Sequence, residues 1–371
     1  MKILINASNL KIGGGLQVAH SVINHILNQP AISHDFVFVV STELELFLFD
    51  QIKNVRDKFI TYDVPAMVHT SLLGKNKFLD QIVNNFKIDR VFTVFGPSYW
   101  RPIVPHTTGY AKPQYIYTDS PFFKQLNFAA RLKLSLKRKL HLYSFKNHTD
   151  QLISENEDVS VKLRSMMPGK KIHTVSNYYH QIFDDPSKWL PSSGLDNCDD
   201  FKILVLASNY PHKNLNLIPD VIKKLKSKFE NFSFKFVLTI DEKEFKDKGS
   251  EILDHILFMG KIGIAQCPDL YRNSDLLFLP TLLECFTATY PEAMKMEVPI
   301  LTSDLGFARG ICENAAYYVD PLDPDQISDS IYKLHRDKEL VNRLIVHGRQ
   351  RLLKFDTHGD RVRKYINIIE A

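Results

Sequence analysis

The chain has 371 residues, of which 44% are hydrophobic and 24% are charged, and its formal net charge is +5. This length favours two domains, and the composition is typical of a soluble globular protein. No apolar run approaches the roughly 20 residues needed to span a bilayer. The four cysteines lack a disulfide or metal-site spacing, so we expect reduced thiols and no bound metal.

The first apolar run, residues 2–7, indicates a buried parallel strand and not a signal peptide, because charge and glycine follow it at once. We therefore expect a cytoplasmic protein, or one that lies on the cytosolic face of the inner membrane. Gly13, Gly14 and Gly15 come next, before a helix that begins near Leu16. Glycines permit positive φ and a close approach of backbone to a ligand. The spacing is not that of a dinucleotide site, so a ligand-binding loop and a plain turn are both open.

The rest of the first half alternates between strands and helices. Further strands are predicted at residues 36–40, 59–62, 90–95, 114–118, 151–154 and 172–175. Asp119 follows the predicted strand 114–118, at an end where a carboxylate can accept a hydroxyl proton or orient an acceptor. Capping of a helix by Asp119 or Ser120 is the alternative.

A basic segment runs from Pro121 to Thr149. It contains seven lysines and arginines and no acidic residue, and apolar residues recur among them at three- and four-residue steps. This pattern predicts an amphipathic helix. Such a helix can lie on an anionic membrane surface, or it can pack on its own domain with a solvated basic face. A nucleic-acid partner is not expected, because no nucleic-acid module accompanies the charge.

Residues 185–200 are rich in Pro, Ser, Asp and Gly, a composition that predicts a linker. The strand-like run 201–208 then echoes residues 1–8, and strands are predicted at 235–240, 256–259, 276–279, 299–302 and 316–319. The alternation indicates an α/β protein of two Rossmann-like, doubly wound parallel-sheet domains that face a cleft. We place these domains at residues 1–184 and 201–355, with a C-terminal helix at 356–371 packing back on the N-terminal domain.

Two predicted loops of the second half contain charged residues that can bind a phosphate or a sugar. Lys213 lies in an unusual Pro-His-Lys-Asn run after the first strand, where an ammonium can meet a diphosphate. Glu284 and Glu292 stand eight positions apart, between strand 276–279 and a helix with Pro291 in its first turn. Amides at such a junction bind an anion, and carboxylates accept from sugar hydroxyls. Solvated charges on ordinary βα loops are the alternative for all three side chains.

These residues carry a family likeness. The second half resembles the retaining glycosyltransferases of family GT4, which have the two-domain GT-B fold. The likeness rests on the region from Glu284 to Glu292 and on the runs Tyr210-Pro-His-Lys-Asn214, Phe258-Met-Gly260 and Val298-Pro-Ile-Leu-Thr-Ser303. The first half matches more weakly, at Ile153-Ser154-Glu155 and Val175-Ser-Asn177.

The resemblance implies a nucleotide-sugar donor bound mainly by the second domain. Glu284 would lie by the donor sugar, with the amides of Phe286 and Thr287 near sugar and phosphate. Glu292 would accept from the ribose, and Lys213 would meet the diphosphate.

The resemblance also implies an acceptor bound mostly by the first domain. Asp119, from its place after the predicted strand 114–118, is the candidate residue that would orient this acceptor. Gly14 and Gly15 would close on the donor. Asn209 would take part in donor binding near the diphosphate. The leaving phosphate would take the acceptor proton in a same-face substitution, so no protein base, cofactor or metal is expected.

The sequence departs from the family pattern at three places. Asn209 stands where many relatives have an arginine, Thr118 where many have a histidine, and Cys285 and Thr287 where glycines are common. The favoured function is hexosyl transfer to a glycan or lipid-linked acceptor in the synthesis of a surface polysaccharide such as lipopolysaccharide. A sugar-nucleotide 2-epimerase of the same fold and a non-catalytic GT-B protein that binds a glycan or a partner are the alternatives.

Overall fold

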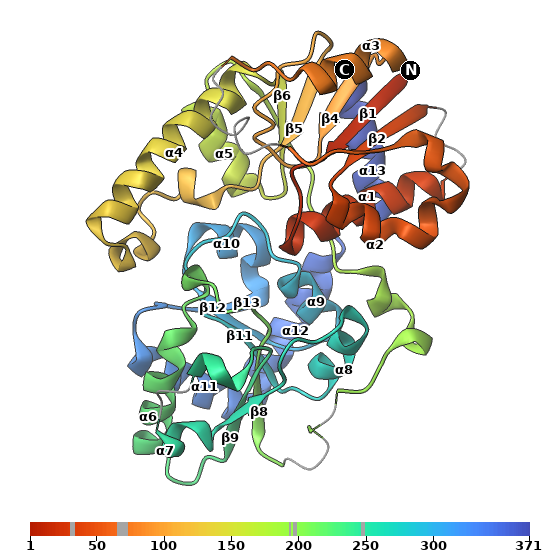
Figure 1. Ribbon diagram of the computed structural model, residues 1–371. Helices are drawn as coiled ribbons and strands as arrows, with labels where there is room; N and C mark the ends of the chain where they lie inside the picture. The colour runs from red at the N-terminus through yellow and green to blue at the C-terminus, as the bar shows by residue number, and fades with distance from the viewer. Residues whose placement is uncertain (30–33, 65–72, 193, 196–198, 246–248) are drawn as a thin grey trace. The chain divides into compact units, whose positions relative to one another are not determined.

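The computed structural model describes the chain except for residues 30–33, 65–72, 193, 196–198 and 246–248. It divides into two compact units, each built on one parallel sheet (Figure 1). The first unit consists of Met1–Thr118, Gln125–Asn177 and Asp356–Ala371, and the second of Asp119–Lys124 and Tyr178–Phe355. The predicted pair of doubly wound parallel sheets is confirmed.

The first unit has a seven-stranded sheet in the order β3-β2-β1-β4-β5-β6-β7. Its strands are β1 (Lys2–Ala7), β2 (Asp35–Val40), β3 (Phe59–Thr61), β4 (Arg90–Thr93), β5 (His106–Gly109), β6 (Gln151–Ser154) and β7 (Lys171–Thr174). Its helices are α1 (Gly13–Leu27), α2 (Thr42–Ile52), α3 (Lys77–Phe86), α4 (Phe128–Asn147), α5 (Glu157–Met166) and α13 (His358–Glu370).

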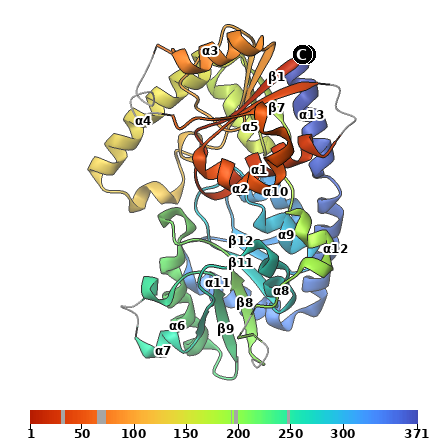
Figure 2. The same cartoon turned by 45° about the vertical axis from the view of Figure 1, so that its right-hand side comes forward.

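The alternation of side chains along β1 separates the two halves of this unit's core. Ile3 and Ile5 point to the face where α1 and α13 pack, and Leu4 points to the opposite face with the apolar residues of α3. Figure 2 shows α1 and α13 side by side on their face of the sheet. Both faces are therefore covered, as an all-parallel sheet requires.

The second unit has a six-stranded sheet in the order β10-β9-β8-β11-β12-β13. Its strands are β8 (Phe201–Val205), β9 (Phe234–Leu238), β10 (Ile256–Phe258), β11 (Leu276–Leu279), β12 (Ile300–Ser303) and β13 (Ala316–Val319). Its helices are α6 (Ile218–Lys228), α7 (Ser250–Leu253), α8 (Cys267–Arg272), α9 (Thr289–Lys295), α10 (Gly306–Cys312), α11 (Pro324–Arg336) and α12 (Lys338–Leu352).

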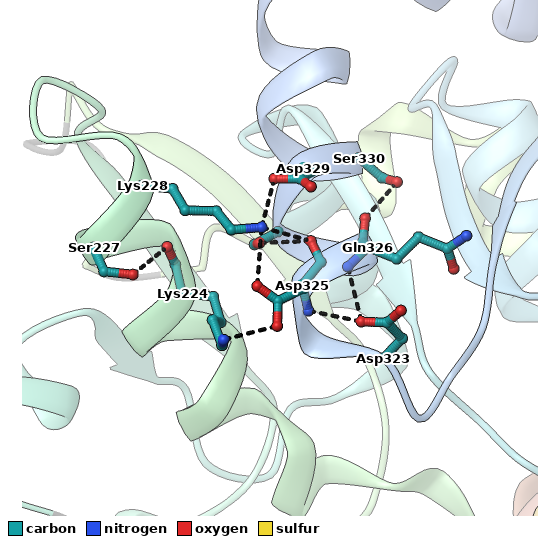
Figure 3. A network of polar contacts seen from close by, with 9 residues as sticks. Lys224, Ser227, Lys228, Asp323, Asp325, Gln326, Asp329 and Ser330 are labelled. Carbon is teal, nitrogen blue, oxygen red and sulfur yellow. Dashed lines mark hydrogen bonds and ion pairs between the residues drawn. The ribbon is translucent and has the colours of Figure 1, made fainter.

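Helices α6 and α11 are joined by a surface ion-pair network (Figure 3). Lys228 Nζ lies 3.0 Å from an oxygen of Asp325 and 2.9 Å from one of Asp329, and Lys224 Nζ lies 2.7 Å from Asp325. Asp323 caps α11 by accepting from two backbone amides. Solvent screens such exposed pairs, so the apolar contacts of Ile222, Leu225 and Ile331 provide most of the packing.

The predicted strand at residues 114–118 is wrong. Pro113 begins a 3-10 turn there, and the amides of Ile116 and Tyr117 both donate to its carbonyl. Proline fixes φ near the helical value and lacks an N–H for a sheet ladder. The strand in this part of the sheet is β5, which the apolar pattern missed because it contains a polar, buried His106. The His106 ring is 2.7 Å from the carbonyl of His148 and 2.8 Å from Thr93 Oγ1, which satisfies both nitrogens.

The units also differ from the predicted domain bounds. Residues 178–184 belong to the second unit, where Phe183 packs against Tyr271 with ring centroids 5.8 Å apart. The predicted linker 185–200 is attached to the same unit, because Ser192 donates to the Asp269 carboxylate at 2.7 Å. Residue 193 and residues 196–198, Cys198 among them, lie outside the described residues. The other three cysteines are buried, and none of them forms a disulfide among the described residues.

Candidate functional site

The candidate site lies where the strand order of the second unit's sheet reverses, between β8 and β11. From β8 the chain continues to β9 on one side, and it later returns to β11 on the other side (Figure 1). The loops that follow β8 and β11 diverge at this switch point, which is where open parallel sheets bind ligands. The loop after β8 carries Lys213, and the loop after β11 carries Glu284. The topology therefore brings two distant predicted residues to one edge of the sheet.

Lys213 and Glu284 form an ion pair through Nζ and Oε1, and their side chains are 18% and 12% exposed. Thr281 Oγ1 donates to the same carboxylate oxygen at 3.1 Å. The ammonium retains two further N–H donors for a ligand. A partly buried cation on this edge suits a phosphate, and the neighbouring carboxylate suits a hydroxyl.

The two loops are also joined through their backbones. The amide of Leu282 donates to the carbonyl of His212 at 2.7 Å. Asn214 ends the short helical turn 211–213 in a left-handed conformation, with φ of 58°, and its side-chain amide donates to the carbonyl of Pro321 at 2.8 Å. Asparagine is one of the few residues that tolerate this conformation. The Pro-His-Lys-Asn run thus holds Lys213 in place by local backbone chemistry.

Phe286 and Thr287 continue the loop from Glu284 to α9. Both are half-buried, and the Phe286 ring lies edge-on to Phe355 with centroids 6.1 Å apart. Among the residues that the structure describes, none accepts a hydrogen bond from either amide. These two N–H groups remain available to an anionic or hydroxylated ligand. Asn209, on the loop after β8, is half-buried as well.

Glu292 lies inside α9 and is buried, with 6% of its surface exposed. The Tyr271 hydroxyl donates to its Oε2 at 3.0 Å. Burial raises the pKa of Glu292 to about 7, and the Tyr271 bond opposes that rise. The alternative of a solvated acid is therefore wrong for Glu292. Tyr271 itself was not identified as a site residue from the sequence.

Asp119 does not end a strand, since the predicted strand 114–118 is absent. Instead residues 119–124 pack within the second unit, where the Ser120 hydroxyl donates to the carbonyl of Leu282 at 2.6 Å. Ser120 also accepts from the amide of Phe122, so Ser120 and not Asp119 performs the capping. The exposed Asp119 is therefore next in sequence to a residue bonded to the loop that carries Glu284.

Gly14 and Gly15 belong to the first unit and lie in the first turn of α1, so the expected loop before Leu16 is shorter than predicted. Gly13 has φ of 71°, which favours glycine at the entry to this helix. A Cβ on Gly15 would lie 3.3 Å from Leu10, whereas one on Gly14 would meet no atom within 4 Å. Packing against Leu10 thus explains a glycine at position 15, whereas no contact within the first unit requires a glycine at position 14.

A cluster of three aromatic rings around His212 was not assigned a role in the site from the sequence. The rings of Tyr210 and His212 are stacked, with centroids 5.8 Å apart, and Phe122 lies edge-on to His212 at 6.4 Å. Burial lowers the pKa of His212 although Glu284 opposes the change. The Pro-His-Lys-Asn run contained the signal for His212. Phe122 could be found only from the tertiary structure, because it comes from another part of the chain.

The described part of the chain contains no cluster of three or more histidine, cysteine or acidic side chains arranged to hold a metal ion. Among the same residues, no helix combines the length and apolar character that crossing a bilayer requires.

Comparison with known proteins finds a family model that matches most of the second unit. Residues 191–351 match the family model "Glycosyl transferases group 1", which confirms the resemblance to these enzymes. The chain is 23% identical over 149 residues to "Phosphatidyl-myo-inositol mannosyltransferase" of Mycobacterium leprae (strain TN). It is 21% identical over 235 residues to "O-antigen chain mannosyltransferase RfbU" of Salmonella typhimurium (strain LT2). The alignments cover 39% and 62% of this chain, and they span only 40% and 60% of these two relatives.

The solved structures agree on the fold. A crystal structure of Anabaena Alr3699/HepE in complex with UDP and glucose matches all of this chain and 100% of that one, with a TM-score of 0.71 and 12% identity. The two-domain GT-B fold expected from the resemblance is therefore confirmed.

Proposed function

We propose that this chain, whose residues 191–351 match the group 1 glycosyltransferases, transfers a sugar from a nucleotide-sugar donor to a glycan or lipid-linked acceptor. The observation that carries the proposal is the Lys213–Glu284 pair at the switch point of the second sheet. A cation for a diphosphate and an acceptor for sugar hydroxyls lie side by side there. The relatives named as mannosyltransferases, and the UDP and glucose of the HepE complex, support a hexose on a nucleotide.

Lys213 neutralises the leaving diphosphate in this proposal, while Glu284 accepts from a donor-sugar hydroxyl. The amides of Phe286 and Thr287 add donors near the sugar and phosphate. Such preorganised groups act on charge that develops as the glycosidic bond breaks. The leaving phosphate takes the acceptor proton on the same face, so configuration is retained. Lys213 and the two amides stabilise the negative charge of the leaving diphosphate, and the proposed reaction uses no metal or cofactor.

The name of one relative gives phosphatidyl-myo-inositol, a lipid, and the name of the other gives the O-antigen chain. We therefore propose that this chain contributes to a cell-surface polysaccharide or lipid-linked glycan. Asp119, adjacent to the residue bonded to Leu282, is proposed to orient the acceptor hydroxyl.

A donor panel tests the proposal directly. UDP-, GDP- and ADP-sugars are compared by thermal shift, since a ligand at 100 times its Kd stabilises the native state by about 2.7 kcal/mol. The donor that binds is then incubated with lipid and glycan fractions, and the labelled product is isolated. Conversion of the donor sugar without an acceptor would identify a 2-epimerase instead. Binding with neither transfer nor conversion would identify a non-catalytic binding protein.

Replacing Glu292 by glutamine is expected to raise KM for the donor and to leave kcat nearly unchanged. A ribose contact is made equally in the ground state and the transition state, and such uniform binding affects KM alone. Steady-state kinetics on the identified donor provide the measurement. Glu297→Gln is the matched control, because Glu297 lies just beyond α9 and is exposed in an ion pair with Arg349. A lower kcat at constant KM would instead place Glu292 in the chemical step.

A further inference from the structure

Helix α4 has an apolar face that its own unit does not cover. Phe128, Leu132, Leu136 and Tyr143 are 82%, 53%, 61% and 45% exposed, respectively. At 3.6 residues per turn these four side chains lie within about 80° of one another around the helix axis. Only Ser144 and Phe145 of α4 are buried. In Figures 1 and 2 the first half of the helix extends away from the strands of its unit. The helix is bonded to its own unit through His141 and Arg138, but these four apolar side chains are not packed on that unit.

The charge around this face has one sign. Five exposed basic residues belong to α4, which are Arg131, Lys133, Lys137, Lys139 and Lys146, and the helix contains no Asp or Glu. Lys139 and Lys146 project from the same side as the apolar residues, with Arg131 and Lys133 on its two flanks. Arg138 has a separate structural task, because its Nε donates to the carbonyl of Tyr115 at 2.9 Å.

An open groove continues the face at its C-terminal end. It has a volume of about 490 Å³ and lies between α4 and the end of α5, with Leu142, Tyr143, Met166 and Met167 beside Lys139 and Lys146. Lysines next to flexible apolar side chains suit an anionic head group with hydrocarbon attached.

We propose that this face of α4, with the adjoining groove, docks the first unit on an anionic lipid surface. The apolar ladder of Phe128, Leu132, Leu136 and Tyr143 enters the boundary between head groups and acyl chains. The head groups are contacted by the basic residues on and beside this face, which are Arg131, Lys133, Lys139 and Lys146. A polyanion such as nucleic acid would engage the basic residues but leave Phe128, Leu132 and Leu136 in water. Charge complementarity together with the exposed apolar ladder therefore selects a lipid surface. This inference is independent of the proposed transferase activity, although it would place a lipid-linked acceptor near the enzyme.

Vesicle cosedimentation with the full chain tests the proposal. The protein is expected to bind vesicles of phosphatidylcholine mixed with phosphatidylglycerol and not vesicles of phosphatidylcholine alone. Binding should fall as salt rises, because charge interactions are screened beyond about 10 Å at 0.1 M and about 3 Å at 1 M. Replacing Lys133, Lys139 and Lys146 by glutamate is expected to weaken binding by roughly a hundredfold, since each basic residue near the lipid contributes about fivefold. Arg138 is kept because it bonds to Tyr115.

An apolar variant separates lipid from other polyanions. Phe128→Ser, Leu132→Ser and Leu136→Ser together should weaken vesicle binding by about tenfold or more while retaining every positive charge. The matched control is Leu46→Ser with Phe49→Ser on α2, whose side chains are 69% and 59% exposed in a helix with glutamates in its first turn. This control is expected to bind as the wild type does.

Three results would overturn the proposal: a wild type that does not bind anionic vesicles, a serine variant that binds like the wild type, or loss of binding in the α2 control. Circular dichroism and the donor thermal shift establish that each variant is folded. Donor binding is expected to remain unchanged in all of them. The lipid-docking proposal can therefore fail while the proposed transferase activity stands, and the activity can fail while lipid docking stands.

Discussion

Replacing Lys213 by alanine is expected to reduce turnover of the identified donor by about a hundredfold or more. Loss of one preorganised donor to a developing negative charge costs roughly 2.7–4 kcal/mol in the barrier. The fold should persist, because the loops at this edge are joined by the Leu282 amide and the His212 carbonyl and not by the lysine side chain. Initial rates at saturating donor, with circular dichroism for the fold, provide the measurement.

Glu284→Ala is expected to have a similar effect, and the two variants together distinguish catalysis from structure. If the ion pair only stabilised the loops, removing both partners would restore activity that either single change removes, because neither charge would be left unpaired. If both side chains contact the donor, the double variant stays inactive. Glu284→Gln keeps a hydroxyl-binding oxygen, removes the charge and should retain more donor affinity than Glu284→Ala.

The matched control for Lys213 is Lys224→Ala. Lys224 is also a lysine of the second unit in an ion pair with a carboxylate, that of Asp325, but it lies on α6 in the surface network of Figure 3. Its removal should leave turnover near the wild-type rate. Near-normal activity of Lys213→Ala on a verified donor would show that the diphosphate assignment is wrong.

Replacing Glu292 by glutamine is expected to stabilise the protein at alkaline pH, by an amount on the order of 3 kcal/mol. Burial raises the pKa of this carboxyl from 4.5 to about 7 in the folded state. An acid with a raised pKa favours folding while it is protonated in both states, so its contribution is fully present below about pH 4.5 and is lost as pH rises through 7. Each unit of pKa difference corresponds to about 1.4 kcal/mol. Glutamine remains neutral and can still accept from Tyr271.

Urea unfolding of the wild type and the variant at pH 5, 6, 7 and 8 measures this effect. The stability difference should be small at pH 5 and reach its full value near pH 8. Glu297→Gln is a control of opposite sign, because Arg349 holds the pKa of Glu297 below its usual range and the charged form is the favoured one. That effect should be small, since solvent screens an exposed pair. A Glu292→Gln difference that does not vary with pH would exclude ionisation as its cause. Increased stability with a raised donor KM would indicate that a strained, buried acid is retained for function.

Local sequence pattern was sufficient for most of the second unit. Short apolar runs such as residues 276–279 are typical of a strand buried on both faces, and the loops after such strands emerge at one edge of a parallel sheet. Lys213 and Glu284 could therefore be assigned to one site from their positions after two strands, and the structure brings them together. The strand β5 and the turn at Pro113 were missed, because the burial of His106 depends on partners from Thr93 and His148 that are distant in sequence.

Three features were decided by tertiary structure alone. Residues 119–124 belong to the second unit, where Ser120 bonds to Leu282 and Phe122 contacts His212, and no local sequence pattern predicts these contacts. The burial of Glu292 depends on Tyr271 from another helix. The apolar stripe of α4 has the same helical spacing whether it faces a core or solvent, since periodicity records which residues share a face and not what covers it. The sequence by itself determined the two parallel sheets and the paired charges after β8 and β11, because these follow from neighbours along the chain. Exposure, burial and the crossing of a segment between units depend on neighbours in space.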